Sequence, residues 1–138
     1  FAAYQIDGEM NLLAAYTCTP LVRIPVKALS DKGKVKGTTI AELGNRNRPL
    51  DMVVYRKGDK DFILMANSSR GVMKVKLDKV AQVEPITERI GGGGTAGVIY
   101  ETIKELQGVT QLDGLNDREA VVLIETENGS QLKTITLP

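Results

Sequence analysis

The sequence contains no histidine and a single cysteine, Cys18, among its 138 residues. Without histidine the chain cannot supply a Ser-His triad, a histidine-ligated zinc or haem, or the commonest general base. A lone cysteine cannot form an internal disulfide, and neither a histidine nor a second cysteine is present to activate it as a nucleophile. We therefore expect Cys18 to serve packing or a turn, and we lean against an enzyme.

Aromatic residues and long apolar runs are also scarce. Aromatic side chains make up 4% of the chain and tryptophan is missing, so the core must be built from aliphatic residues. Purely apolar runs such as 121–124 are far shorter than the ~20 residues that a membrane-spanning helix needs. The sequence starts at Phe1 without the features of a secretory signal, so we expect a processed, trimmed or partial chain.

Positive and negative side chains are present in nearly equal numbers. With 18 basic and 17 acidic residues, the net charge of +1 is too small to attract nucleic acid. The positive charge concentrates in one run: Arg23, Lys27, Lys32, Lys34 and Lys36. This run has no interleaved aromatic residues for stacking on bases. We interpret it as a solvated strand edge and predict no nucleic-acid partner.

Short alternating or apolar segments fill most of the sequence. They lie at 4–6, 12–16, 21–26, 52–55, 62–66, 72–77, 109–112, 120–124 and 132–137. Pairs such as Asp7-Gly8 and Asn128-Gly129 separate them and supply the positive φ of tight turns. The pattern predicts an all-β protein of mainly antiparallel strands.

The hairpins repeat along the chain. Residues 12–26 align without a gap on 63–77, at an offset of 51 residues, and Ala15 falls on Ala66. A third copy begins at 121 with an offset of 58 residues from 63, and two extra turn residues bring 132–137 onto 72–77. Each copy predicts a strand, a tight turn and a second strand.

Flanking segments complete three units of four strands. First strands are predicted at 2–6, 49–55 and 109–115, and a fourth strand at 38–43 in the first unit. In the second unit the fourth strand is predicted at either 83–86 or 98–106. The units then span approximately 1–44, 45–106 and 107–138 of one β domain. Repeats of ~40 to 55 residues with four antiparallel strands are typical of β-propeller blades.

One stretch of the second unit resembles a known family of blades. Residues 48–55, a polar turn and then 62–67 resemble a blade of the NHL, YVTN or gluconolactonase-like propellers, in which Pro-x-Asp opens the inner strand. The resemblance implies four-stranded propeller blades and slightly favours an extracytoplasmic location. The alternative folds are a single β-sandwich or barrel of about ten strands, or an α+β fold.

Three units are too few for a closed ring. Propellers close with roughly 4 to 8 blades, so we expect additional polypeptide or partner subunits to complete this one. The predicted function is a binding or protein-interaction scaffold within a larger chain or complex. The alternative is the propeller portion of a lactonase-like hydrolase or oxidoreductase, with a metal or cofactor at the ring mouth.

Candidate metal ligands follow from the resemblance. It implies that Asn45, Asn47 and Asp51 face the mouth of the central channel, where such side chains hold calcium in lactonase-like relatives. The simpler interpretation is a hydrogen-bonded turn that leads into a strand. We predict no cofactor, with calcium as the alternative.

A glycine-rich segment at 91–97 matches Gly-x-Gly-x-x-Gly at Gly92, Gly94 and Gly97, the pattern of a dinucleotide-binding loop. That fold also needs a buried parallel strand before the glycines. The preceding residues 82–89 are charged and contain a proline. We therefore expect a surface loop followed by a strand or short helix.

Overall fold

The computed structural model describes residues 1–30 and 33–138, and Lys32 of the basic run lies outside the described residues. The all-β prediction is confirmed, because strands make up 61% of the chain and the described ranges contain no α-helix. The strands are β1 (Ala2–Ile6), β2 (Glu9–Ala15), β3 (Cys18–Pro25), β4 (Thr38–Asn47), β5 (Pro49–Lys57), β6 (Lys60–Asn67), β7 (Gly71–Lys76), β8 (Thr95–Gly97), β9 (Tyr100–Ile103), β10 (Val109–Gly114), β11 (Glu119–Thr126) and β12 (Gly129–Thr136). The short 3-10 helices of the described residues are η1 (Val26–Ser30), η2 (Val80–Gln82) and η3 (Gly91–Gly93). In the part of the chain that the structure describes, no helix is long and apolar enough to span a membrane.

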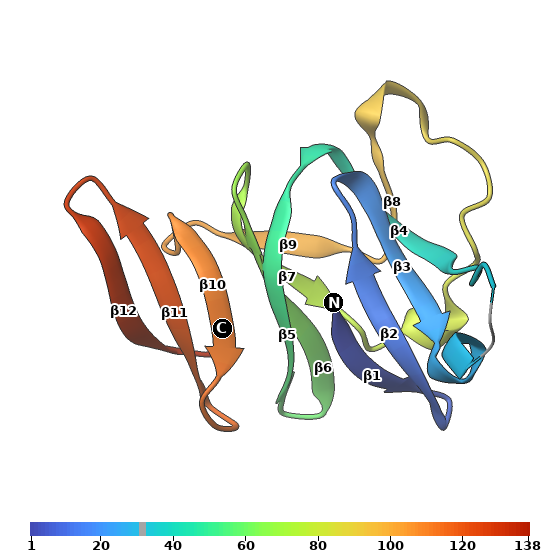
Figure 1. Cartoon of the computed structure of the whole chain (residues 1–138), viewed down its shortest axis with the longest axis horizontal. Coiled ribbons are helices and arrows are strands. Elements are labelled where there is room, and N and C mark those ends of the chain that lie inside the picture. The colour runs from blue at the N-terminus through green and yellow to red at the C-terminus, as the bar shows by residue number, and fades with distance from the viewer. Residues whose placement is uncertain (31–32) are drawn as a thin grey trace.

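In the described ranges, the strands form three antiparallel sheets, none of them closed. The first has the order β1-β2-β3-β4-β8, the second β5-β6-β7-β9 and the third β10-β11-β12. Figure 1 shows the three sheets side by side in chain order. The strand that begins the second sheet, β5, contacts both β1 and β10, the first strands of the other two. This arrangement differs from the single sandwich or barrel that the sequence also allowed.

The hairpins of the first two sheets have the same register. Ala15 pairs with Leu21 across β2 and β3, and Ala66 pairs with Val72 across β6 and β7. The equivalence continues along both hairpins, as the gapless alignment predicts. Equal turn lengths and the same alternation of apolar residues fix a common register, since a slip of one residue would turn every side chain to the other face.

The alignment of the third hairpin at an offset of 58 residues is wrong. It places Val122 on Leu64, but both side chains belong to the same buried cluster between the second and third sheets. They therefore face each other, whereas equivalent residues of stacked sheets would point the same way. Since residues 121–124 are all apolar, their sequence carries no alternation to define which face each residue takes.

Two apolar layers hold the three sheets together. The first layer lies between the first and second sheets and includes Leu13, Ile63 and Met65. The second lies between the second and third sheets and includes Leu64 and Val122. Side chains of β6 alternate between the two layers, so this strand is buried on both faces. An aliphatic run of this kind is typical of a strand covered on each side.

The outer strands partly differ from the expected units of four. The predicted strand at 38–43 is observed as the longer β4, and β9 rather than 83–86 is the fourth strand of the second sheet. The segment between β7 and β9 contributes β8, which pairs with β4 as a fifth strand of the first sheet. The third sheet has only β10, β11 and β12 in the described part of the chain.

Candidate functional site

The predicted calcium ligands lie where the first sheet passes into the second, at the end of β4 and the start of β5. Gly44 and Arg46 have φ angles of 90° and 62°, so the backbone bends sharply here. The Asn45 side chain is exposed, and its Oδ1 accepts a hydrogen bond of 2.9 Å from the Arg46 N–H. This local contact stabilises the bend, which is a common use of asparagine.

Asn47 is completely buried. Its Oδ1 accepts a hydrogen bond from Nδ2 of Asn67, and its own Nδ2 donates to the Tyr16 carbonyl at 3.5 Å. The Oδ1 of Asn67 accepts the N–H of Arg48 at 3.4 Å and that of Ser69 at 3.0 Å. The two amides therefore connect the hairpin turns of the first two sheets, with one hydrogen bond between them and their other buried polar atoms paired with backbone groups.

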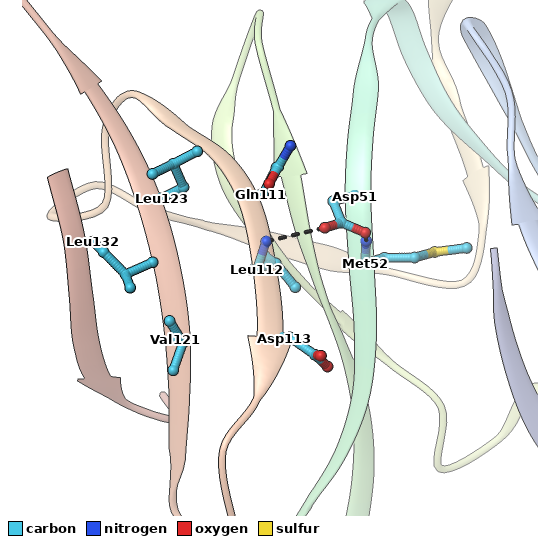
Figure 2. A pocket seen from close by; sticks show the side chains of 8 residues that line it. All are labelled: Asp51, Met52, Gln111, Leu112, Asp113, Val121, Leu123 and Leu132. Atoms are coloured by element: carbon cyan, nitrogen blue, oxygen red, sulfur yellow. Dashed lines mark hydrogen bonds between the residues drawn. The ribbon is translucent and has the colours of Figure 1, made fainter. Parts of the chain in front are cut away.

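Asp51 connects the second sheet to the third. Its Oδ1 accepts the Met52 N–H at 2.9 Å, and its Oδ2 accepts the Leu112 N–H of β10 at 3.0 Å. Figure 2 shows the second bond crossing from β5 to β10. The register of β5 against β6 shifts between Pro49 and Asp51, and β10 has a similar irregularity just before Leu112. Such irregularities redirect side chains and leave a backbone N–H free for another acceptor.

A groove of about 440 Å³ lies beside this bridge. Its polar lining comes from Asp51, Gln111 and Asp113, and its apolar lining from Met52, Leu112, Val121, Leu123 and Leu132. Figure 2 shows that these side chains come from four strands, β5, β10, β11 and β12. The Asp113 Oδ1 accepts the Gly114 N–H at 2.8 Å, so each carboxylate of the groove is hydrogen-bonded to backbone.

The candidate ligands have separate hydrogen-bond partners, and those contacts favour a structural role for all three. Calcium takes ~6 to 8 oxygen ligands. One side-chain oxygen of Asn45, one of Asn47 and both of Asp51 already accept hydrogen bonds within the protein. Within residues 1–30 and 33–138, no three histidine, cysteine, aspartate or glutamate side chains gather as a metal site. Calcium at this place stays a prediction.

The glycine-rich segment is part of the first sheet's outer edge. It follows residues that form no strand, and it continues into β8 rather than a helix. Gly97 has a φ of 73°, and a Cβ there would lie 2.1 Å from the Ile40 carbonyl oxygen. The glycine is needed because β8 approaches β4 too closely for a side chain. The strand-loop-helix geometry of a dinucleotide site is not present in this described segment.

Cys18 and the basic run at 23–36 were also considered in the sequence, and their described residues lie in the first sheet or next to it. Cys18, which was expected to serve packing or a turn, is exposed, and its φ of 88° places it at a sharp bend that begins β3, so the structure agrees with the turn alternative. In the basic run, Lys27 forms an ion pair with Glu9, and the exposed Lys34 and Lys36 precede β4.

Two tyrosines link neighbouring sheets. The Tyr4 hydroxyl donates to Asp61 Oδ2 at 2.8 Å, and burial together with this carboxylate raises the pKa of Tyr4 to about 12. The Tyr55 hydroxyl donates to the Pro138 carbonyl at 2.7 Å, and burial followed by the charge of Glu101 raises its pKa further above the ordinary value. Both phenols are held in their neutral, donating form.

Comparisons with known proteins provide no relative from which a role can be transferred. No protein-family model matches the chain, and no curated protein or solved structure matches it.

The contacts between sheets involve groups that the sequence did not single out. The backbone N–H of Leu112 completes the Asp51 bridge, and every residue except proline has such a donor, so no sequence pattern marks it. Asn67 ends the stretch 62–67 that resembles a propeller blade, but its hydrogen bond to Asn47 was not predicted. Leu132 lines the groove although its sequence context is that of an ordinary strand residue.

Proposed function

We propose that the three sheets are consecutive blades of a β-propeller, that additional polypeptide completes the ring, and that the ring serves as a binding or protein-interaction scaffold. The order of the sheets supports this proposal. Each sheet begins with the strand that contacts the first strand of its neighbour, as β5 does with β1 and β10. In a propeller the first strands of successive blades likewise surround a central channel.

The observation that carries the proposal is the matched apolar face of the first sheet. Leu12, Ala14, Val22 and Ile24 stand in the same register positions as Ile63, Met65, Met73 and Val75. The second set is completely buried against the first sheet. The first set faces away from the second sheet and is only half-buried. A sheet face with the composition of an intersheet layer fits a further blade packed on it.

The third sheet has a corresponding face on the opposite side of the stack. Val121 and Leu123 are half-buried, and Leu132 is 72% exposed. Val121 and Leu123 alternate along β11 with Val122, which packs against the second sheet, and Leu132 of β12 pairs with Leu123. Apolar residues therefore occupy both faces of the third sheet. Its outward face fits a further blade, packed on the end of the stack opposite the first sheet.

A scaffold is favoured over the enzyme alternative by the contacts at the junction of β4 and β5. A metal or cofactor at the ring mouth requires ligand atoms that are available to it. At Asn47 and Asp51, side-chain oxygens are instead occupied by hydrogen bonds that hold neighbouring sheets together. Rigid contacts of this kind suit a surface that presents fixed loops to a partner.

The outward face of the first sheet provides the test. In the complete protein, Leu12→Asp would bury an unpaired charge under the next blade and cost more than about 2 kcal/mol of unfolding free energy. The matched control is Leu115→Asp, at a turn position that is 54% exposed, with an expected effect within about 0.5 kcal/mol. Denaturant midpoints measure both. Equal, near-zero effects would contradict a covered face.

Assembly of the 138-residue chain provides a second test. With two uncovered apolar faces, the isolated chain is expected to self-associate or to unfold without a sharp transition. Sedimentation and thermal unfolding measure these properties. A monodisperse monomer of 15.0 kDa that unfolds cooperatively would contradict the proposal of a ring completed from outside.

A further inference from the structure

The segment that joins β7 to β9 encloses a pocket beside the outer strands of the first two sheets. The pocket has a volume of about 450 Å³, and its walls come from the end of β7, from η2 and from the connection between β8 and β9. Its apolar lining consists of Val80, Val83, Val98 and Ile99. Small-molecule sites in proteins have volumes of ~300–1,000 Å³ and mostly apolar linings, so this pocket has the size and character of such a site.

Backbone contacts fix both walls of the pocket. The Val98 N–H donates to the Ile40 carbonyl at 3.1 Å, and the Lys76 N–H donates to the Ile99 carbonyl at 3.1 Å. These two bonds hold the connection between β8 and β9 against β4 and β7. On the other wall, the buried side chain of Val80 anchors η2 in the first apolar layer. The pocket is therefore formed before any ligand enters it.

The side chains of η2 divide between the apolar layer and solvent. In a 3-10 helix, residues three apart lie on the same side. Val80 and Val83 share the side that packs into the first apolar layer, and Lys79 and Gln82 share another. Both Lys79 and Gln82 are exposed, and both line the pocket. The pocket therefore combines an apolar lining with an ammonium group and an amide.

The charge around the pocket is positive. Lys76 and Lys79 contribute two positive charges to the lining and Asp78 contributes one negative charge, which leaves a net charge of +1. Within the described residues, neither lysine forms an ion pair. An anionic ligand is therefore favoured over a cationic one.

Ile99 adds an apolar surface that the described chain does not cover. Its side chain is 64% exposed, and it borders both this pocket and a second hollow of about 470 Å³. The neighbouring Gly97 has a φ of 73° and lies against the backbone of β4, so the path of the chain into Ile99 is fixed. An apolar group placed against Ile99 would remove this surface from water.

We infer that this pocket binds a small organic acid, with its carboxylate at Lys79 and Gln82 and its apolar body against Ile99. The ammonium and amide N–H groups donate to the carboxylate, and the charge strengthens these hydrogen bonds. All residues of the pocket come from 76–99, in the middle of the chain. The inference does not rest on the proposed ring, because the outward faces of the first and third sheets contribute nothing to the lining.

Octanoate tests the inference on the complete protein, because it joins a carboxylate to an apolar chain. Hydrogen–deuterium exchange locates its binding. Slower exchange is expected in fragments that cover 76–83 and 97–99, and not in those that cover β10 at 109–114. Octylammonium has the same chain with the opposite charge, and acetate has the carboxylate without the chain. Neither should give protection at the concentration at which octanoate does.

Two substitutions separate the charged and apolar contributions. Lys79→Gln should weaken octanoate binding by about threefold, because it removes an exposed cation. Ile99→Ser should weaken binding by about fivefold, because it removes the apolar surface. Lys133→Gln and Leu115→Ser are the matched controls, since they change an exposed lysine and an exposed leucine outside the pocket. Calorimetric titration measures the four affinities, and both controls should bind as the original protein does.

Three results would overturn the inference. The first is an absence of protection at 76–83 and 97–99, including protection that appears only elsewhere in the protein. The second is equal binding of octanoate and octylammonium, because it would mean that charge does not select the ligand. The third is an affinity of both pocket variants that matches the controls. The Leu12→Asp experiment succeeds or fails separately, since Leu12 does not line this pocket.

Discussion

The second and third sheets differ in how much of each strand is covered. Strand β6 of the second sheet has apolar side chains in both layers, and Ile63 to Ala66 are completely buried. Within the described residues, strand β12 of the third sheet pairs with β11 alone, and its side chains are mostly exposed. β6 is the first strand of its hairpin and β12 is the second strand of another hairpin, so the position of a strand in its sheet contributes to its burial as well as its sequence alternation. The neighbours on each face determine burial, and among the described residues the second sheet packs against a sheet on both faces whereas the third packs against one.

The largest expected effect compares one leucine from each sheet. Leu64 is completely buried, whereas Leu132 is 72% exposed. Leu64→Ala should cost about 2–5 kcal/mol, because it removes buried methyl groups and leaves a cavity. Leu132→Ala in the same 138-residue chain should change stability by no more than about 0.5 kcal/mol. Because this chain is not expected to unfold in one sharp transition, local amide exchange in β6 and β11 measures the loss of stability in both variants. Equal losses would mean that the third sheet's outward face is also covered.

The next effect concerns the bridge between the two sheets. Asp51→Ala should cost about 1.5–3 kcal/mol, since it removes a charged acceptor and leaves the Leu112 N–H without its partner. Asp113→Ala is the control, because its carboxylate accepts only from the adjacent Gly114 N–H. The third sheet should also show faster amide exchange in the Asp51 variant. Similar losses of stability for both variants would mean that the hydrogen bond from Leu112 to Asp51 does not hold the two sheets together.

Two alanines at equivalent hairpin positions sharpen the comparison. Ala66 is completely buried between the second and third sheets, and Ala15 is half-buried beside the first layer. Ala66→Leu should cost about 1–3 kcal/mol by overpacking. Ala15→Leu should also destabilise, but less, since its surroundings have more room. Two near-neutral denaturant midpoints would contradict the packing of these positions between stacked sheets.

The smallest effect appears at alkaline pH. The pKa of Tyr4 is raised to about 12 in the folded chain, against 10.0 for an ordinary tyrosine. Between these values the unfolded chain loses the phenolic proton while the folded chain keeps it. Stability from this group is therefore complete below pH 10 and is lost as the pH rises toward 12. Tyr4→Phe should reduce the decline of unfolding free energy between pH 9 and about 11.5, and an unchanged decline would exclude Tyr4 as its source.

The sequence predicts the hairpins of the first two sheets well, because the residues that determine a hairpin lie next to one another in the chain. Gly71 and the matching register around Ala15 and Ala66 follow from turn residues and from apolar alternation. The pairing of β8 with β4 was missed, since it joins segments about fifty residues apart and depends on a glycine that permits close approach. The third hairpin was misaligned by one residue because an unbroken apolar run does not define its faces.

The candidate site was only partly predictable for a similar reason. Asn45, Asn47 and Asp51 were singled out as polar residues at a junction, and the structure gives each a hydrogen-bonding role. Their partners include backbone groups and an amide from other strands. Such partners carry no recognisable sequence pattern, so a metal site and a set of intersheet ties have the same appearance in sequence. Only the positions of their acceptor oxygens distinguish the two.

The contacts of Leu137 and Pro138 determine how the third sheet would respond to mechanical tension. The Pro138 carbonyl accepts from the Tyr55 hydroxyl, and the Leu137 carbonyl accepts from Lys57 Nζ at 3.2 Å. Both donors belong to β5 of the second sheet. A pull on residue 138 is therefore transmitted to β5 before it can peel β12 from β11. These two bonds connect the end of the third sheet to the second, in addition to the Asp51–Leu112 bond and the apolar layer between the two sheets.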